Sequence, residues 1–498
     1  ENLDAALRKG RVDDRRSGQY AWAKLEGKGA LEGLQFQYHR QAWDYRTGMG
    51  WIFQIPDLPE QLQERRDILA LGYSGKLGGL GSQEYLVRFQ RHDLSWNVRF
   101  FPSGTDGLPN GMNEVLDTSC QDWFARAQWS FDLPKGASLL AGIEATRFLY
   151  QGDRSHYAVD FDLSTYLPAS GVIPAGPWLE FIQDQPILTT GFFAQLDSGE
   201  LLGSQLKAVA GVRFDRASLD YTQIYDEGRP KASRTYSNTS PRLALVYTPA
   251  PNLAVKAMFG SAFRAPAPSE IAGANTYTLA SNIGELKPET LDTAELAVDW
   301  IVTPNLNWRT NLFHTKFKDQ IAYSIENVNL SSNVYTLTTQ GVETELLFGY
   351  GTLKGYVNYA FARRVDEDIK DRYIQAEKDR LTWEPAHRLK AGVIYYWGPW
   401  TFSANLLHQG EVERRRTDRG IQELPLPGVD VDRYRPGALE AWTRIDGRVA
   451  YDWRGASVAL VVQNLLDSDR IRLVKPQAYP FDYQGEGRRV SLVLRTVF

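Results

Sequence analysis

The feature that most constrains this chain is the strict alternation of short turns and long loops along the sequence. Counting back from the C-terminus, the connections at 453–456, 397–399 and 349–351 are short, whereas those at 467–487 and 409–440 are long. The short connections carry Gly, Pro, Asn or Asp, the residues that tight turns favour. Short turns on one rim and long loops on the other are typical of β-barrels of the bacterial outer membrane, where the short turns are periplasmic.

Between these connections the sequence alternates between apolar and polar residues. In the last segment, Val490, Leu492 and Leu494 alternate with Ser491 and Arg495, so one face is apolar and the other polar. A soluble β-sandwich also alternates, but its connections have mixed lengths. A strand that crosses a bilayer as part of a barrel needs only about 9 to 11 such residues. The loop asymmetry therefore favours the membrane barrel over the sandwich.

The composition excludes several other classes. Hydrophobic residues make up 43% of the 498 residues, yet no stretch approaches the roughly 18 uncharged apolar residues of a membrane-spanning helix. The net charge is −4 with both signs mixed along the chain, so nucleic acid is not an expected partner. The single Cys120 excludes an internal disulfide framework and a CxxC metal site, and no cofactor is expected.

The strand count carries information in its parity. The alternation predicts about 19 strands, with a further hairpin around 156–167 inside the connection 151–186. The first strand, at 17–25, and the last strand both run toward the short-turn side, so an antiparallel barrel needs at least one more strand. Either 1–10 supplies it or it lies outside this chain. We therefore expect an all-β fold, a large antiparallel transmembrane barrel of about 19 to 22 strands across 1–498.

Two stretches resemble the signature region of TonB-dependent receptors. The stretch 238–266 ends in Phe263, Arg264, Ala265 and Pro266, and the stretch 284–300 contains Leu286, Lys287, Pro288 and Glu289. In that family a strand ends in FRAP at the outer rim, and an NPNLKPE-like element precedes the next strand; the Asn-Pro-Asn part is absent here. The terminal Phe498 looks like the signal that the outer-membrane insertion machinery reads in this family. The resemblance covers about the last 300 residues well, whereas the first 200 match only in the spacing of strands and connections.

The resemblance implies a function. Members of the family import a scarce, bulky ligand, most commonly a ferric siderophore, with energy that TonB delivers to an N-terminal plug inside a barrel of 22 strands. No segment here resembles the plug, so we expect the plug, and possibly the first one to three strands, to lie outside this chain. The resemblance places the protein in the outer membrane, among lipid and lipopolysaccharide. The alternative is a passive porin, or a structural barrel that acts as a scaffold in an envelope complex.

The prolines of the two motifs also have a physical explanation that does not depend on the resemblance. Pro266 and Pro288 cannot donate to a β-ladder, so both are expected where strand pairing stops. This favours a loop-shaping role for FRAP and LKPE over direct ligand contact. Haem is disfavoured as the ligand because 267–285, where haem receptors of the family typically place a histidine, contains none.

Long loops supply the candidate ligand contacts. The loop 409–440 holds a cluster of arginines that could attract an anionic chelate: Arg414, Arg415, Arg416 and Arg419. The same arginines could instead pair with neighbouring acids or with lipopolysaccharide phosphates. Aromatic side chains on the loops could stack on a ligand, although they could equally pack the loops together; they are Trp178, Phe181, Tyr221, Tyr225, Tyr277, Tyr434, Tyr479 and Tyr483.

Charged residues within the strands are expected on the lumen side of the wall. They are Arg388, Lys390, Arg444, Asp446, Arg448 and Arg495. In a wet or plugged lumen their charges are satisfied, so they are interpreted first as wall residues. An enzyme would need a catalytic triad or a carboxylate pair at one rim, and the sequence suggests none; His92 next to Asp93 is too weak a signal. No catalytic activity is expected.

Overall fold

The computed structural model describes most of the chain. The described residues are 15–47, 60–101, 112–162, 167–174, 179–201, 205–224, 227–272, 286–324, 330–370, 384–413, 438–468, 472–473 and 483–496. No helix among them is long and apolar enough to cross a membrane.

A single antiparallel sheet of 20 strands dominates the described structure. Its strands in the N-terminal half are β1 (Arg16–Glu26), β2 (Leu34–Thr47), β3 (Glu60–Lys76), β4 (Gly81–Phe101), β5 (Met112–Asp132), β6 (Ser138–Asp162), β7 (Leu167–Pro174), β8 (Pro186–Asp197), β9 (Leu206–Thr222), β10 (Lys231–Ala250) and β11 (Leu253–Arg264). Its strands in the C-terminal half are β12 (Glu289–Thr303), β13 (Leu306–Ser324), β14 (Leu330–Tyr350), β15 (Leu353–Ile369), β16 (His387–Trp397), β17 (Trp400–Gln409), β20 (Trp442–Trp453), β21 (Ala456–Gln463) and β24 (Arg489–Thr496).

Smaller elements lie outside the sheet. They are the 3-10 turns η1 (Gly29–Leu31), η2 (Pro134–Gly136) and η3 (Glu180–Ile182), the short helix α2 (Pro268–Ala272), and two two-residue ladders, β18 (Val412–Glu413) with β19 (Ala438–Leu439) and β22 (Arg472–Leu473) with β23 (Tyr483–Gln484).

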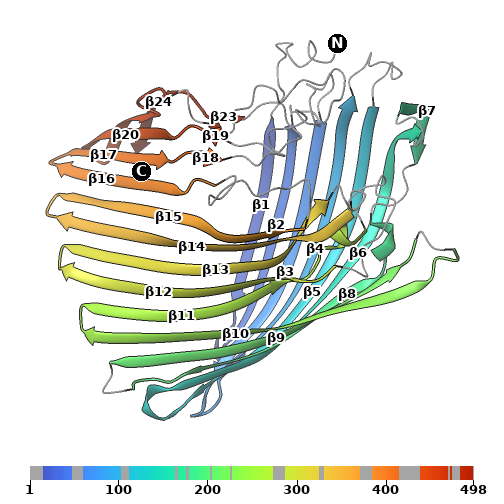
Figure 1. The fold of residues 1–498 in the computed structure, drawn as a ribbon, viewed down its shortest axis with the longest axis horizontal. Helices are drawn as coiled ribbons and strands as arrows, with labels where there is room; N and C mark the ends of the chain where they lie inside the picture. Colours follow the sequence, from blue (N-terminus) through green and yellow to red (C-terminus); the bar gives the residue numbers. More distant parts are fainter. Residues whose placement is uncertain are drawn as a thin grey trace.

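The sheet forms a continuous wall. Each strand pairs with the strands before and after it in the chain, and β7 pairs only with the outer part of β6, which leaves 19 strands in the wall. The β6–β7 hairpin confirms the extra hairpin expected around 156–167. The wall curls round, with β1 to β6 standing upright and β9 to β15 running across the view, while the shorter β16 and β17 lie to the left of β1 (Figure 1). The predicted all-β architecture is thereby confirmed.

Connections between the strands alternate as predicted. Tight hairpins join β14 to β15, β16 to β17 and β20 to β21. The last of these turns has Arg454 at φ 46° and Gly455 at φ 83°. Positive φ at both central residues suits the right-handed twist of a two-residue hairpin. Both β1 and β24 end on the short-turn rim, because Glu26 leads into the turn to β2 and Thr496 pairs with Ala456.

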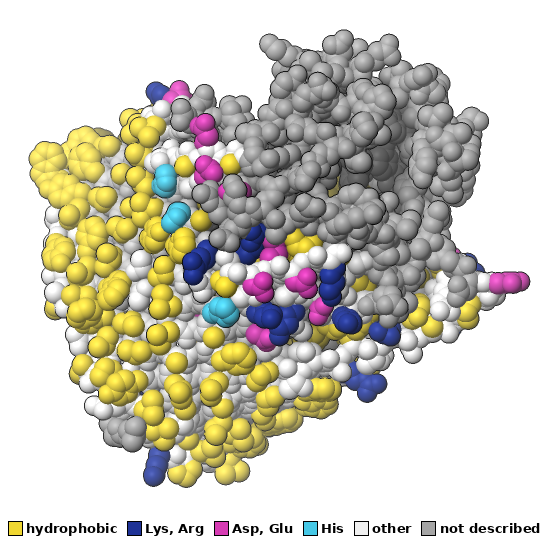
Figure 2. All heavy atoms as spheres, in the orientation of Figure 1, with side chains coloured by type: hydrophobic (Ala, Val, Ile, Leu, Met, Phe, Trp, Pro, Cys, Tyr) yellow, Lys and Arg dark blue, Asp and Glu magenta, His cyan; other side chains and the backbone are white. Residues whose placement is uncertain are grey.

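The two faces of the wall differ in polarity. On one face the register places large apolar residues side by side across strands, as with Leu296 and Leu312 on β12 and β13. Both are exposed, at 46% and 49%. Apolar side chains cover this outward face on the side of the short turns (Figure 2). The alternate residues, such as Asp299 and Arg309, are polar and lie on the opposite face, toward the lumen. The outward face is thus suited to hydrocarbon.

Aromatic residues gather at the short-turn rim. Trp397 and Trp453 are 63% and 62% exposed, and Trp400 packs on Tyr451 with ring centroids 4.8 Å apart. Rings with a polar edge favour the boundary between hydrocarbon and water. This rim therefore has the aromatic girdle of a membrane barrel.

Glycines and aromatic rings face each other across strands in the wall. Gly341 lies opposite Phe313, and a Cβ added to Gly341 would lie 2.5 Å from Phe313 Cζ and 2.1 Å from the Phe361 carbonyl oxygen. Gly392 lies opposite Tyr356, whose Cε1 would be 2.4 Å from an added Cβ. Each ring covers the backbone that its glycine leaves bare, which pins the register of the pair.

Candidate functional site

Most ligand contacts predicted from the sequence lie outside the described residues. They are Arg414, Arg415, Arg416, Arg419, Trp178, Tyr225, Tyr277, Tyr434 and Tyr479; the terminal Phe498 lies outside the described residues as well. Tyr483 belongs to β23, of which only the backbone is described. Two further aromatics expected on loops are buried in one cluster: Phe181 lies in η3, as expected, whereas Tyr221 lies near the end of strand β9 and not on a loop. The arginine cluster stays a prediction.

The two motifs are described, and they meet at the loop-side end of the wall. Arg264, the last residue of β11, is in register with Glu289, the first residue of β12. Strand pairing stops there, so Pro266 and Pro288 both lie just outside the ladder, as expected. Arg264 donates from Nε to Glu289 and from Nη1 and Nη2 to the carboxylate of Glu270, both at 2.8 Å. We call Arg264, Glu270 and Glu289 the rim latch.

Glu289 ties a third strand into the rim latch. Its side chain accepts a hydrogen bond from the Ile321 amide of β13 at 2.7 Å, and the residue is only 6% exposed. A buried carboxylate is costly unless it is paired and hydrogen-bonded, and here it is both. The latch therefore fixes where β11, β12 and β13 end relative to one another.

The LKPE motif is held through its backbone. The Lys287 amide donates to Asn333 Oδ1 at 2.8 Å, and Asn333 Nδ2 donates back to the Lys287 carbonyl at 2.9 Å. Leu286 is 1% exposed and belongs to a buried cluster with Ile271 of α2 and Ile321 of β13. The Lys287 side chain itself is exposed and makes no ion pair or hydrogen bond within the described part of the chain. Backbone and apolar contacts thus anchor this motif.

Sequence reasoning missed Glu270, although a local signal was present. Pro268 opens α2, and Glu270 follows two residues later; its carboxylate accepts from the Ala267 amide at 2.7 Å. A Pro at the first position and a Glu at the third are a recognised start of a helix. Asn333 carried no such signal, because it lies far away in sequence. In the rim latch each charged group has an opposite charge beside it. This pairing favours a role in shaping the rim over direct contact with a ligand.

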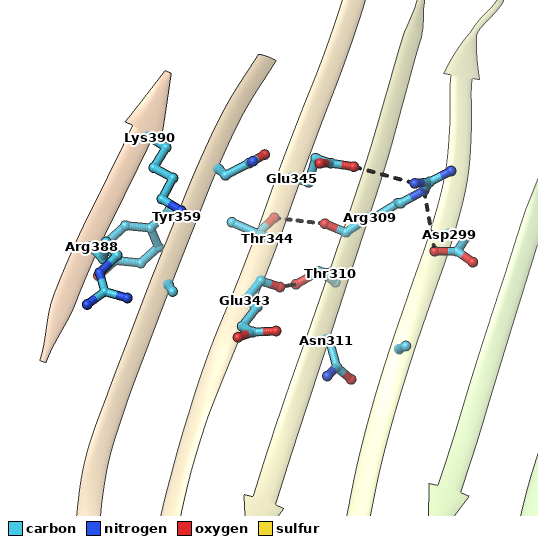
Figure 3. A pocket seen from close by; sticks show the side chains of 13 residues that line it. Asp299, Arg309, Thr310, Asn311, Glu343, Thr344, Glu345, Tyr359, Arg388 and Lys390 are labelled. Carbon is cyan, nitrogen blue, oxygen red and sulfur yellow. Dashed lines mark hydrogen bonds and ion pairs between the residues drawn. The ribbon is translucent and has the colours of Figure 1, made fainter. Parts of the chain in front are cut away.

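A recess of about 460 Å³ lies on the lumen face of β12 to β16 (Figure 3). Arg309 lies between two acids there, with Nη1 3.5 Å from Glu345 and Nε 3.9 Å from Asp299. Across β15, the recess is bordered by Arg388 and Lys390 of β16. It is a polar, water-accessible wall site with both signs of charge.

The register connects this recess to the C-terminal strands. Lys390 pairs with Leu407 of β17, which pairs with Arg444 of β20, so these residues share the lumen face. Arg388, Asp446, Arg448 and Arg495 have the same alternation on their strands, opposite to exposed apolar residues such as Val393 and Leu494. All six charged residues predicted for the lumen therefore lie on that face. No group of three or more His, Cys, Asp or Glu residues suited to a metal ion occurs among the residues that the structure describes.

Comparisons with known proteins agree with this architecture. Residues 4–465 match the family model "TonB dependent receptor-like, beta-barrel". No curated protein matches the chain in sequence.

Solved structures share the fold at low sequence identity. The ferric-catecholate import receptor Fiu from K12 E. coli is 13% identical, with a TM-score of 0.65 over 97% of this chain and 74% of that chain. The siderophore receptor PirA from Acinetobacter baumannii is 15% identical, with a TM-score of 0.67 over 99% and 73%. The copper transporter OprC is 15% identical, with a TM-score of 0.67 over 96% and 72%. The chain belongs to the TonB-dependent receptor family, as a β-barrel of the outer membrane.

Proposed function

We propose that this barrel imports a bulky metal chelate, foremost a ferric siderophore, across the outer membrane. The observation that carries the proposal is the combination of an apolar outward face with a lumen face lined by charged residues along 19 strands. A wall of that size encloses a lumen wider than side chains can fill. Structural relatives named as a ferric-catecholate import receptor, a siderophore receptor and a copper transporter support this class of cargo.

TonB is the partner that the family implies. In this family TonB acts on a plug domain within the barrel, and we propose that the plug is contributed by a segment outside residues 1–498. The described strands all belong to the wall or to its loops. We also propose that Phe498 serves as the signal for the outer-membrane insertion machinery.

Lipid and lipopolysaccharide are the proposed surroundings of the outward face. Along β3 and β4 that face changes from the exposed Leu71 and Val87 to a charged group nearer the loops. There Arg91 and Asp93 pair at 3.1 Å, and Arg65 lies 3.0 Å from Asp67. The change marks a boundary between hydrocarbon and the charged head-group layer.

Uptake in cells tests the proposed function. A strain that lacks the gene, grown with iron limitation, is supplied with radiolabelled ferric siderophores of the catecholate, hydroxamate and carboxylate classes. We expect one class to be lost, to return on complementation, and to be lost again when TonB is deleted. Unchanged uptake of all three classes would contradict the proposed cargo.

Conductance separates this function from the passive pore. The full natural gene product is reconstituted in a planar bilayer. A transporter is expected to stay closed, whereas a large and steady current would favour a porin. A structural scaffold is expected to be closed and also to leave uptake unchanged.

A further inference from the structure

Charge is distributed unevenly around the lumen face of the wall. On β12 to β14 the charged residues of that face are mostly acids: Glu295, Asp299, Glu343 and Glu345, with Arg309 among them. On β16, β20 and β24 they are mostly cations: Arg388, Lys390, Arg444, Arg448, Arg489 and Arg495, with Asp446 and Asp452 as the acids. We call the six cations the basic strip.

An uncharged stretch in the middle of β15 separates the two regions. Between them, β15 presents Asn358 and Ala360 to the lumen, opposite Glu345 and Glu343 on one side and Lys390 and Arg388 on the other. Two strand spacings amount to about 9.6 Å. No ion pair between the acids of β14 and the cations of β16 occurs in the described structure, and Figure 3 shows Glu343 and Lys390 apart on either side of β15.

Most of the basic strip is not neutralised. Arg444 lies 2.8 Å from Asp446, and Arg388 lies 3.1 Å from the exposed Glu384. Lys390, Arg448, Arg489 and Arg495 make no ion pair among the residues that the structure describes. The strands between them, β17 and β21, present only uncharged residues to the lumen; these are Thr401, Ser403, Asn405, Leu407, Gln409, Ser457, Ala459, Val461 and Gln463.

The basic strip runs along the wall as well as across it. On β24, Arg495 is paired with Ser457 near the short turns, whereas Arg489 is paired with Gln463 toward the loops. Six residue steps span roughly 20 Å along a strand; because barrel strands are tilted by about 45°, this is roughly 14 Å across the membrane, about half of the thickness of the hydrocarbon core. On β20, Arg448 likewise lies nearer the short turns and Arg444 nearer the loops. A ligand moving between the proposed plug and this wall would meet positive charge over about half of the hydrocarbon thickness.

The outward side of the same strands carries no compensating charge. Val393, Val449, Leu460, Leu492 and Leu494 are exposed there, on the face suited to hydrocarbon. A low-dielectric wall does not screen the charge beside it, so the field of the cations is focused into the lumen. This local excess exists in a chain whose net charge is −4.

We propose that the basic strip binds multiply charged anions and forms an anion track along the lumen. Charged side chains that line a pore select ions of the opposite sign, and arginine and lysine are the residues that select anions and phosphates. The proposal rests on the proposed function and deepens it, because it assigns the imported chelate to the anionic class. Carboxylate and catecholate chelates of iron belong to that class.

Binding to the purified full chain tests the track without any need for transport. Inorganic triphosphate is titrated at low ionic strength by calorimetry. In the test variant Lys390, Arg448, Arg489 and Arg495 are all replaced by Gln, and we expect affinity to fall about tenfold or more. In a matched control variant four other lumen-face cations, Arg66, Arg126, Arg242 and Lys354, are replaced by Gln, and affinity is expected to stay within about twofold.

A third variant separates charge from fold. Lys390→Arg with Arg448→Lys, Arg489→Lys and Arg495→Lys keeps every charge, so it is expected to bind triphosphate as the native chain does. Circular dichroism verifies that each variant is folded. Equal losses in the test and control variants, or no loss in the test variant, would overturn the track. Loss of binding in the test variant with no effect on siderophore uptake would instead retain the track and reject the proposed cargo.

Discussion

At the residue scale, the rim latch makes a prediction about local stability. Arg264→Ala leaves the buried Glu289 with one partner fewer, and an unsatisfied buried group costs about 1 to 3 kcal/mol. We expect faster hydrogen exchange at the Ile321 amide, which donates a hydrogen bond to Glu289. We also expect faster proteolysis between β11 and β12. Arg309→Ala is the control, since Arg309 is 60% exposed and its pairs are weak. Exchange that does not change in Arg264→Ala would show that the latch does not hold the rim.

Adjacent residues on opposite faces allow a second prediction. Leu312 lies on the outward face and Asn311 on the lumen face. Leu312→Arg should reduce the free energy of unfolding by about 2 to 4 kcal/mol, because it places a charge in hydrocarbon. Asn311→Arg should have little effect, since the lumen face is wet and Glu295 and Glu343 lie nearby. Unfolding by denaturant in lipid vesicles measures both, and equal effects would contradict the assignment of the two faces.

At the scale of elements, the glycine–aromatic pairs make a third prediction. Gly341→Ala places a methyl group against Phe313 and the Phe361 carbonyl. Such overpacking costs about 1 to 3 kcal/mol. Gly260→Ala on β11 is the matched control, because nothing lies within 4 Å of its added Cβ. We expect the Gly341 variant to unfold at lower denaturant concentration than the control; coinciding transitions would show that the ring does not pin the strand.

Strands and short turns were predictable from the sequence because each leaves a local pattern. Alternation identifies a strand such as β24, and a Gly in a tight turn identifies the hairpin at Gly398. The contacts of Arg264 were not predictable, since Glu289 lies 25 residues away and is placed by register. The basic strip was only partly predictable: all of its residues except Arg489 were named for the lumen face, but their excess over acids depends on which strands are neighbours.

At the scale of the whole molecule, orientation in the membrane makes a fourth prediction. Short turns should face the periplasm and long loops the cell exterior. In a Cys120→Ser background, Glu227→Cys lies between β9 and β10 on the loop side, and Thr352→Cys lies in a short turn; both positions are exposed. A membrane-impermeant maleimide applied to intact cells should label only the first. Labelling of Thr352→Cys in intact cells would mean that the barrel is inserted the other way round.

The order of strands in the wall also has a consequence for how the molecule is made. Each wall strand is hydrogen-bonded to its neighbours in the chain, from β1 and β2 at one edge to β21 and β24 at the other. Contacts between segments close in sequence incur little loop-closure entropy. The barrel can therefore grow hairpin by hairpin, each new pair using the edge of the last as its template, and only the pairing that closes the barrel joins segments distant in the sequence.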